Sequence, residues 1–148
     1  MSIKVSIDAS GGDFGFPVTI SAGINALISF SDLHINFVGD EKGIKEELEK
    51  KSIYKSFLDR IEITHASEVI NMHDSPSTAL RHKKDSSMRV AINLVQSGIS
   101  DACVSAGNTG ALMSIARFVL KTIEGVDRPA IMSAFPTLTG PTHVLDLG

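Results

Sequence analysis

Short apolar runs that end in Gly, Asp or Ser alternate along this chain with longer segments whose apolar positions recur at helical spacing. The short runs predict strands near Ile3–Ile7, Ile35–Val38, Ile61–Thr64 and Asp101–Ser105. The longer segments predict helices over Pro17–Phe30, Glu41–Lys51, Ser87–Ser97 and from about Ala111 to Leu120. This is a βαβ pattern, so we expect an α/β fold around a mostly parallel sheet.

The last two apolar runs differ from the others in the length of their connection. Ala130–Phe135 and Thr142–Leu147 are joined only by Pro136–Pro141. A parallel crossover needs about a dozen residues or more, so this linker is too short for one. The pair therefore predicts an antiparallel hairpin at the C-terminal end.

Length and composition limit the possible classes of protein. The chain has 148 residues, 43% of them hydrophobic, which is typical of one domain with a single core. Its formal net charge of −3 argues against a general nucleic-acid surface. The one cysteine, Cys103, lies in an apolar strand, which favours an inert thiol and a reducing compartment. Because there is neither a run of about 18 apolar residues nor a signal-peptide pattern, we expect a cytoplasmic protein.

The strongest chemical signal is the turn S-A-G-N-T-G-A at Ser105–Ala111, between an apolar run and a predicted helix. A turn of this composition leaves backbone N–H groups unpaired at the positive end of the helix dipole, where anions bind. We therefore predict that this turn binds phosphate, through Ser105, Gly107, Asn108, Thr109 and Gly110.

Two other segments are expected at the same end of the sheet. D-A-S-G-G-D-F-G at Asp8–Gly15 follows the first strand, and its adjacent glycines, Gly11 and Gly12, allow close approach of a ligand. Asp8 and Asp13 could orient a donor or hold a metal ion, and a simple tight turn is the alternative. Arg81–Arg89 carries a basic cluster and a Ser-rich helix start, although such a cluster is often only a solvated surface.

A series of motifs resembles, in order, the bacterial phosphate acyltransferase family of phospholipid synthesis. The longest are K-K-D-S-S-M at Lys83–Met88 and D-A-C-V-S-A-G-N-T-G-A-L at Asp101–Leu112. The others are D-A-S-G-G-D at Asp8–Asp13, V-G-D-E at Val38–Glu41, Ala116–Lys121, Asp127–Ala130 and Leu145–Gly148. Two departures are visible: Ser10 stands where the family typically has methionine, and Phe14–Phe16 replaces a histidine-containing stretch, so no catalytic histidine is assigned there.

The resemblance implies transfer of an acyl group from acyl carrier protein to inorganic phosphate, giving acyl phosphate. It also implies a three-layer α/β/α fold like those of isopropylmalate dehydrogenases and phosphotransacetylases, and a homodimer. We expect no cofactor and no metal ion. Family members are longer, so residues 1–148 are expected to be a single α/β domain forming the N-terminal portion of the enzyme, inactive when isolated. A membrane-bound glycerol-3-phosphate acyltransferase is a further partner, and peripheral membrane association is compatible with that role.

This chemistry requires positioning and charge stabilisation more than a strong base, because phosphate is already an anionic nucleophile. We predict Lys84 and Asn108 as catalytic residues, with Lys84 or Arg89 neutralising charge. Asp8, Asp13 and Asp85 would orient basic or backbone groups, and a buried Lys84–Asp85 pair would limit water access. The supporting residues are Asp8, Gly11, Gly12, Asp13, Asp85, Ser86 and Arg89.

The same residues also bear on other functions. Asp40, after the second strand, suits the ribose of a nicotinamide dehydrogenase, but no G-x-G-x-x-G opens the first helix and no Walker motif occurs. The five histidines show no spacing typical of a metal site. A non-enzymatic anion-binding or dimerising module remains an alternative. The basic cluster Arg81–Lys84 is a candidate surface for the acidic carrier protein.

Overall fold

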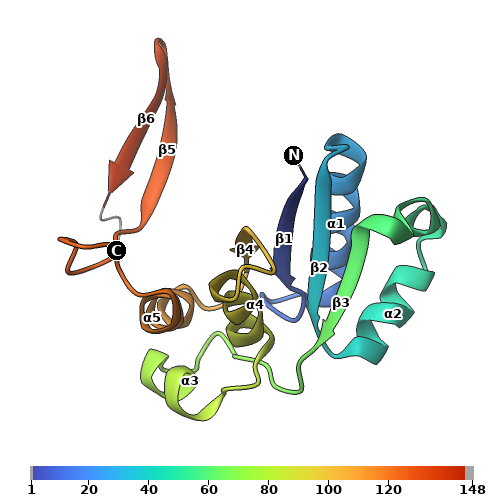
Figure 1. Cartoon of the computed structure of the whole chain (residues 1–148), viewed down its shortest axis with the longest axis horizontal. Helices are drawn as coiled ribbons and strands as arrows, with labels where there is room; N and C mark the ends of the chain where they lie inside the picture. The colour runs from blue at the N-terminus through green and yellow to red at the C-terminus, as the bar shows by residue number, and fades with distance from the viewer. Residues whose placement is uncertain (1, 146–148) are drawn as a thin grey trace.

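A computed structural model describes residues 2–145 and places a four-stranded parallel sheet at the centre of the chain (Figure 1). The strands lie in the order β3-β2-β1-β4. Their bounds are β1 Ile3–Asp8, β2 Leu33–Gly39, β3 Ile61–His65 and β4 Ala102–Val104. The helices are α1 Phe16–Ser29, α2 Glu41–Glu49, the 3-10 helix η1 Ser52–Arg60, α3 Pro76–His82, α4 Ser87–Gln96 and α5 Thr109–Leu120.

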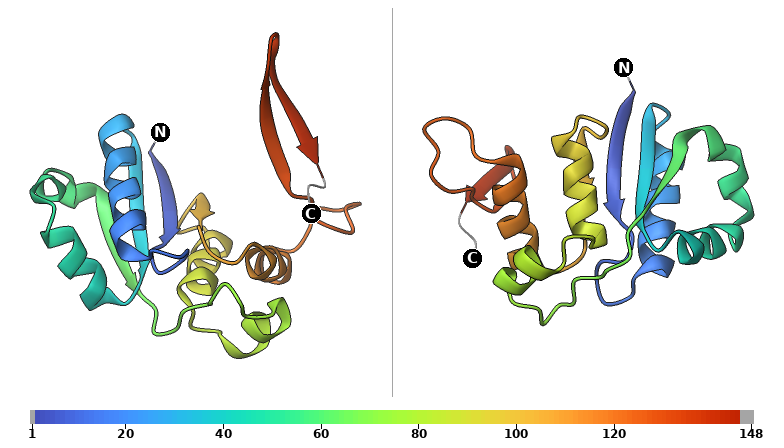
Figure 2. Two further views of the ribbon diagram at one scale, coloured as in Figure 1. Left: turned by 180° about the vertical axis from the view of Figure 1, so that it is seen from behind. Right: turned by 60° about the horizontal axis from the view of Figure 1, so that its bottom comes forward.

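Helices cover the sheet on both faces because both faces of the central strands carry buried side chains. On one face, Ile35 and Phe37 of β2 pack against Ile20 and Leu27 of α1. On the other face, Val38 packs against α4, where the Ser6 hydroxyl donates to the Ala91 carbonyl at 2.9 Å. Figure 2 shows α1 and α4 on opposite sides of the strands. The predicted α/β fold with helices on either side of a parallel sheet is confirmed.

Two helical segments were absent from the sequence prediction. The helix α3 begins with Ser75 accepting from the Thr78 N–H and with Pro76 in its first turn, a start signal that the sequence does contain. The segment η1 has no fully buried residue, although Tyr54 and Phe57 pack against the core, and its non-helical backbone at Phe57 interrupts the regular helical pattern. Both lie on the outside of the sheet body.

The hairpin of β5 (Met132–Thr137) and β6 (Gly140–Leu145) forms a separate two-stranded antiparallel sheet, as the short linker predicted. Its pairing extends further than expected, because Pro136 pairs with Pro141 and Thr137 with Gly140. Figure 1 shows the hairpin standing apart from the parallel sheet. The predicted strand end at residues 146 and 147 lies outside the described residues.

Candidate functional site

The strand order predicts a crevice where β1 and β4 end. The chain leaves β1 toward α1 on one face of the sheet, and it leaves β4 toward α5, which packs with α3 and α4 on the other face. Neighbouring strands whose connections diverge in this way leave an opening at their carboxyl ends, and ligands of open α/β sheets bind there. The two turns predicted to share this edge do so: a Cβ built on Gly12 would lie 3.1 Å from the Ala106 carbonyl oxygen.

Asp8 lies at the centre of this crevice, at the end of β1, with 2% of its surface exposed. Its Oδ1 accepts from the Ser87 hydroxyl at 2.5 Å and its Oδ2 from the Ser105 hydroxyl at 2.6 Å. Burial raises the pKa of Asp8, and the hydrogen bonds from Ser105 and Ser87 partly offset that rise. One carboxylate therefore joins the end of β1, the start of α4 and the turn after β4.

The turn after β4 is organised by two side chains. The Ser105 Oγ accepts from the Gly107 N–H at 3.0 Å, and Asn108 caps α5 by accepting from the Ala111 N–H, also at 3.0 Å. Thr109 and Gly110 are in the first turn of α5, where the helix itself supplies no acceptor for the backbone N–H groups. Within residues 2–145 these two N–H groups have no other hydrogen-bond partner. Thr109 is exposed and Gly110 is partly exposed, and first-turn N–H groups at such a place are typical donors to an anion.

The amide of Asn108 holds a second loop against the site. Its Nδ2 lies 3.3, 3.1 and 2.9 Å from the carbonyl oxygens of Asn71, Met72 and Asp74. Because an amide NH₂ has two protons, these three acceptors occupy its donor capacity. The side chain therefore clamps the loop of residues 69–74, and its predicted contact with phosphate stays a prediction.

The glycines of both turns are required by close packing. A Cβ on Gly11 would lie 2.5 Å from the Asp8 Oδ2, and one on Gly107 would lie 3.1 Å from the Met88 Cε. A Cβ on Gly110 would meet the Pro76 ring at 3.1 Å. Substitution at Gly107 would therefore disturb the interior beneath the turn as well as any ligand above it.

The two adjacent lysines have different surroundings. Lys83 donates to the Val69 carbonyl at 2.7 Å and pairs with Asp74 at 2.5 Å, so it fastens the loop of residues 69–74 from its other end. Lys84 is exposed, and within residues 2–145 it makes no hydrogen bond or ion pair with a side chain. Asp85 is exposed as well, and accepts from the N–H and hydroxyl of Ser67. The expected buried pair of Lys84 and Asp85 is therefore wrong.

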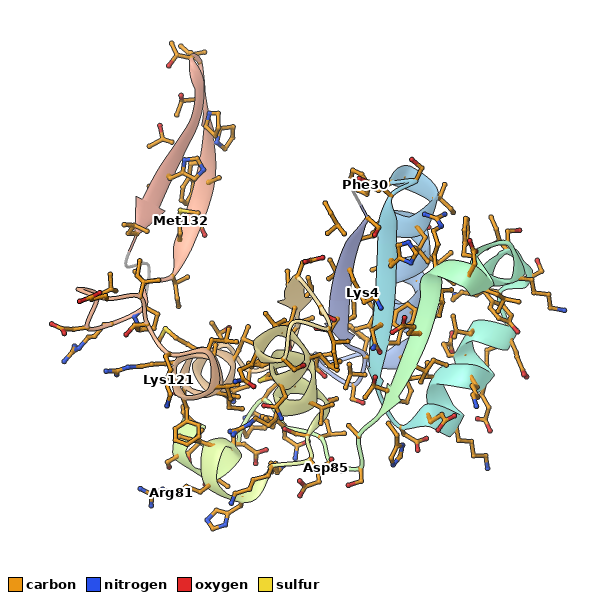
Figure 3. The ribbon with its side chains drawn as sticks, viewed as in Figure 1. Lys4, Phe30, Arg81, Asp85, Lys121 and Met132 are labelled. Carbon is orange, nitrogen blue, oxygen red and sulfur yellow. The ribbon has the colours of Figure 1, made fainter. Side chains whose placement is uncertain are left out.

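The other predicted supporting residues have structural contacts. Ser86 is buried and caps α4, with its Oγ 3.4 Å from the Arg89 N–H. The Arg89 guanidinium lies 5.3 Å from the centre of the Phe118 ring, over α5. Asp13 is exposed and lines a pocket of about 500 Å³ between the loop after β1 and the loop of residues 69–74. Figure 3 shows Asp85 at the lower edge of the body and Arg81 pointing away from it.

Sequence reasoning missed two residues that shape the site. Ser87 was expected only as the start of a helix, yet it shares Asp8 with Ser105. Lys83 was treated only as part of the basic cluster, yet it ties down a loop. Both lie in the K-K-D-S-S-M motif, which is the sequence signal that could have identified them.

Three further observations concern metal ligands, the cysteine and membrane-spanning helices. Among residues 2–145 no cluster of three His, Cys, Asp or Glu side chains could hold a metal ion. Burial, followed by the Asp8 carboxylate, raises the pKa of Cys103, so little thiolate exists at neutral pH. In the described part of the chain no helix combines the length and apolar character needed to cross a membrane.

Comparison with known proteins gives a consistent set of relatives. A family model described as "Fatty acid synthesis protein" matches residues 3–148. A protein of Ruthia magnifica subsp. Calyptogena magnifica named "Phosphate acyltransferase" is 65% identical over 148 residues, which cover 100% of this chain and 43% of the relative. One of the same name from Methylococcus capsulatus is 58% identical over 144 residues, covering 97% of this chain and 42% of the relative. The chain thus spans less than half the length of these curated relatives.

Proposed function

The chain belongs to the fatty acid synthesis protein family, and on that premise we propose that it forms the N-terminal portion of a phosphate acyltransferase. The reaction proposed is transfer of an acyl group from the thioester of acyl carrier protein to inorganic phosphate. The product is acyl phosphate, which feeds phospholipid synthesis. Relatives named phosphate acyltransferase support the reaction class.

The observation that carries this proposal is the crevice between β1 and β4, where the N-termini of α4 and α5 converge on Asp8. Ser87 opens α4 and contacts Asp8 directly, while Ser105 links Asp8 to the turn that opens α5. Two helix N-termini at one point favour an anionic ligand, because their dipoles add and their first N–H groups lack acceptors. The N–H groups of Thr109 and Gly110 are the donors we assign to phosphate.

The proposed step needs no covalent enzyme intermediate. A phosphate oxygen attacks the thioester carbonyl carbon, forming a C–O bond and moving the carbonyl electron pair onto oxygen. When that pair returns, the C–S bond breaks and the carrier thiolate leaves, then takes a proton from solvent. Held N–H donors lower the barrier by fixing the phosphate and by stabilising the oxyanion.

Asp8 has an indirect part in this proposal. As an acceptor from Ser87 and Ser105, it fixes the direction of both hydroxyl groups and leaves the Ser105 Oγ to accept from Gly107. The turn is thereby held in the shape that presents its N–H groups before phosphate arrives. Preorganised donors cost no rearrangement during the reaction.

The charge for phosphate is assigned to Lys84. Its neighbour Lys83 is occupied by Val69 and Asp74, whereas the Lys84 side chain is exposed at the entry to α4. Arg81 and His82 are exposed beside it, so the same segment is proposed to meet the acidic carrier protein. A homodimer, a cytoplasmic location and delivery of product to a membrane-bound glycerol-3-phosphate acyltransferase complete the proposal.

A nicotinamide dehydrogenase gains no support from the site, because the Asp40 carboxylate caps α2 by accepting from the Gly43 N–H at 2.8 Å. A non-catalytic anion-binding module is the alternative that needs an experiment. Residues 1–148 would be joined to the remaining part of the Ruthia relative, here called the joined chain, and compared with residues 1–148 alone.

The test supplies dodecanoyl carrier protein and phosphate and traps acyl phosphate with hydroxylamine. We expect product from the joined chain, and phosphate binding without product from residues 1–148. Because hydroxylamine also reacts with the thioester itself, hydroxamate is counted only above an enzyme-free control. A joined chain that folds and binds phosphate but forms no hydroxamate above that control would contradict the acyltransferase proposal. Enzyme-dependent hydroxamate formation in the absence of phosphate would contradict the role of phosphate as acceptor.

A further inference from the structure

An apolar groove of about 440 Å³ lies beside the candidate site, on the α1 face of the sheet. Its floor is formed by Ile3, Val5 and Ile7 of β1 and by Val104 of β4. These strand positions alternate with Lys4, Ser6 and Asp8, which face α4. The groove ends beneath Asp8 and Ala106, so it is continuous with the crevice.

The helix α1 lines this groove with a row of apolar side chains beyond those it buries against β2. The row is Val18, Ala22 and Ala26, spaced four residues apart on one side of the helix, with Phe30 directly after its end. Val18 is 52% exposed and Phe30 is 59% exposed. A solvated face of a helix would carry polar residues in this row. Within residues 2–145, α1 therefore has a second apolar face without a partner.

The neighbouring strand is open as well. Within the described residues β4 pairs only with β1, so its other edge has no partner, and Val104 is 55% exposed. Seen from behind in Figure 2, α1 lies over the sheet beside β1 while β4 is uncovered on that face. Parallel sheets are almost always covered on both faces, so an open apolar face next to a free edge is an incomplete layer.

We propose that this groove is the docking site of an amphipathic α-helix from the remaining part of the acyltransferase chain. This inference rests on the proposed function, in which the chain is part of an enzyme that is more than twice as long. A helix fits this place because helices are what cover the faces of parallel sheets, and the wall of α1 presents small residues at Ala22 and Ala26. Small side chains at a helix contact permit the shorter end of the usual 8–10 Å interaxial distance.

The docked helix has a consequence for the site. It covers the side of Ala106 that the groove now leaves open, next to the buried Asp8, and so removes water from beneath the phosphate turn. Hydrogen bonds and charges act more strongly where water is excluded. The α1 face of the sheet therefore supplies the back wall of the active site once the helix is present.

The test measures the rate at which single cysteines react with a thiol reagent in the joined chain and in residues 1–148. Both carry Cys103→Ser, with either Ala22→Cys in the groove or Asn25→Cys as the matched control on an exposed position of α1 outside the groove. We expect Ala22→Cys to react at least about tenfold more slowly in the joined chain than in residues 1–148. Asn25→Cys should react equally fast in both chains. Tenfold protection corresponds to about 1.4 kcal/mol for opening the contact.

Three results would overturn the inference. Equal reaction of Ala22→Cys in both chains would show that nothing covers the groove. Protection of residues 1–148 that grows with protein concentration would identify a second copy as the occupant. Protection of the joined chain only after addition of dodecanoyl carrier protein would identify the acyl chain. Because labelling requires no turnover, a joined chain that protects Ala22→Cys yet forms no acyl phosphate would count against the proposed function alone.

Discussion

Asp8 and Asp40 stand at equivalent places, each at the carboxyl end of a neighbouring parallel strand and before a helix, and yet their surroundings differ. Asp40 is exposed and caps α2 through the Gly43 N–H. Asp8 is buried and accepts hydroxyl groups from α4 and from the turn after β4. One carboxylate satisfies its own helix, while the other joins three segments that are distant in sequence.

The sheet topology explains the difference. After β2 the chain continues to the adjacent strand β3, with α1 and α2 packed together, so the end of β2 lies within a regular βαβ unit. After β1, the neighbour on the other side is β4, whose chain departs on the opposite face. The same residue type therefore caps a helix at one strand end and, at the other, joins the segments of the proposed ligand crevice.

The largest effect we expect is a difference in stability between the alanine variants of Asp8 and Asp40. Asp8→Ala leaves the Ser87 and Ser105 hydroxyl groups without their acceptor in a buried place, which costs about 3 kcal/mol of the free energy of unfolding. Asp40→Ala removes one exposed cap, worth about 1 kcal/mol. Urea unfolding of residues 1–148 measures both. Equal losses would show that the two strand ends are energetically alike.

A conservative variant at the same position distinguishes lost hydrogen bonds from lost charge. Asp8→Asn keeps the volume, and a serine hydroxyl can accept from the new NH₂ group as well as donate to the amide oxygen. We expect Asp8→Asn to unfold within about 1 kcal/mol of the native chain at pH 7. A loss as large as that of Asp8→Ala would mean that the negative charge itself holds the crevice.

The meeting of these segments at one edge was predictable from the sequence, because parallel strands end on the same side of a sheet. The contacts of Gly12 with Ala106 and of Asp8 with Ser105 confirm it. The ion pair of Lys83 with Asp74 was not predictable, since Lys83 and Lys84 are adjacent and identical, and only the position of Asp74 in the fold decides which one is tied. The loop of residues 69–74 was missed because its anchors, Asn108 and Lys83, are distant in sequence.

The second prediction concerns positive charge at the two strand ends. In the joined chain, Lys84→Ala is expected to lower acyl phosphate formation about a hundredfold, equivalent to about 2.7 kcal/mol of transition-state stabilisation. Lys42→Ala, beside the end of β2, should leave the rate unchanged, because that lysine is exposed and 3.9 Å from Glu46. A loss below about threefold for Lys84→Ala, with stability intact, would leave Lys84 as a solvated surface residue.

The third prediction removes one backbone donor from each helix N-terminus. Thr109 and Glu41 are the first residues of α5 and α2, where proline is tolerated, and the residues before them have extended backbone. Thr109→Pro deletes a proposed phosphate donor, so calorimetry of residues 1–148 should show phosphate affinity falling about tenfold. Glu41→Pro should leave phosphate affinity unchanged. Unaltered affinity in Thr109→Pro would move the anion site away from this turn.

The smallest effect we expect is a pH dependence of opposite sign at Asp8 and Asp85. Burial raises the pKa of Asp8 above its ordinary value of 3.8. Its contribution to stability is therefore fully present below pH 3.8 and is lost as pH rises through the folded-state pKa. Hydrogen bonds from Ser67 lower the pKa of Asp85, so its contribution is present above pH 3.8 and is lost as pH falls through the folded-state pKa.

These signs can be separated by comparing each aspartate with its asparagine variant, since Asn does not titrate. The free energy of unfolding of the native chain minus that of Asp8→Asn should fall as pH rises above about 4, because the native chain must then ionise a buried carboxyl group. The corresponding difference for Asp85→Asn should fall in the acid direction instead. Denaturant unfolding at a series of pH values between about 3 and 7 measures both. Parallel curves would show that Asp8 is solvated like an exposed aspartate, and the buried crevice that distinguishes β1 from β2 would lose its electrostatic basis.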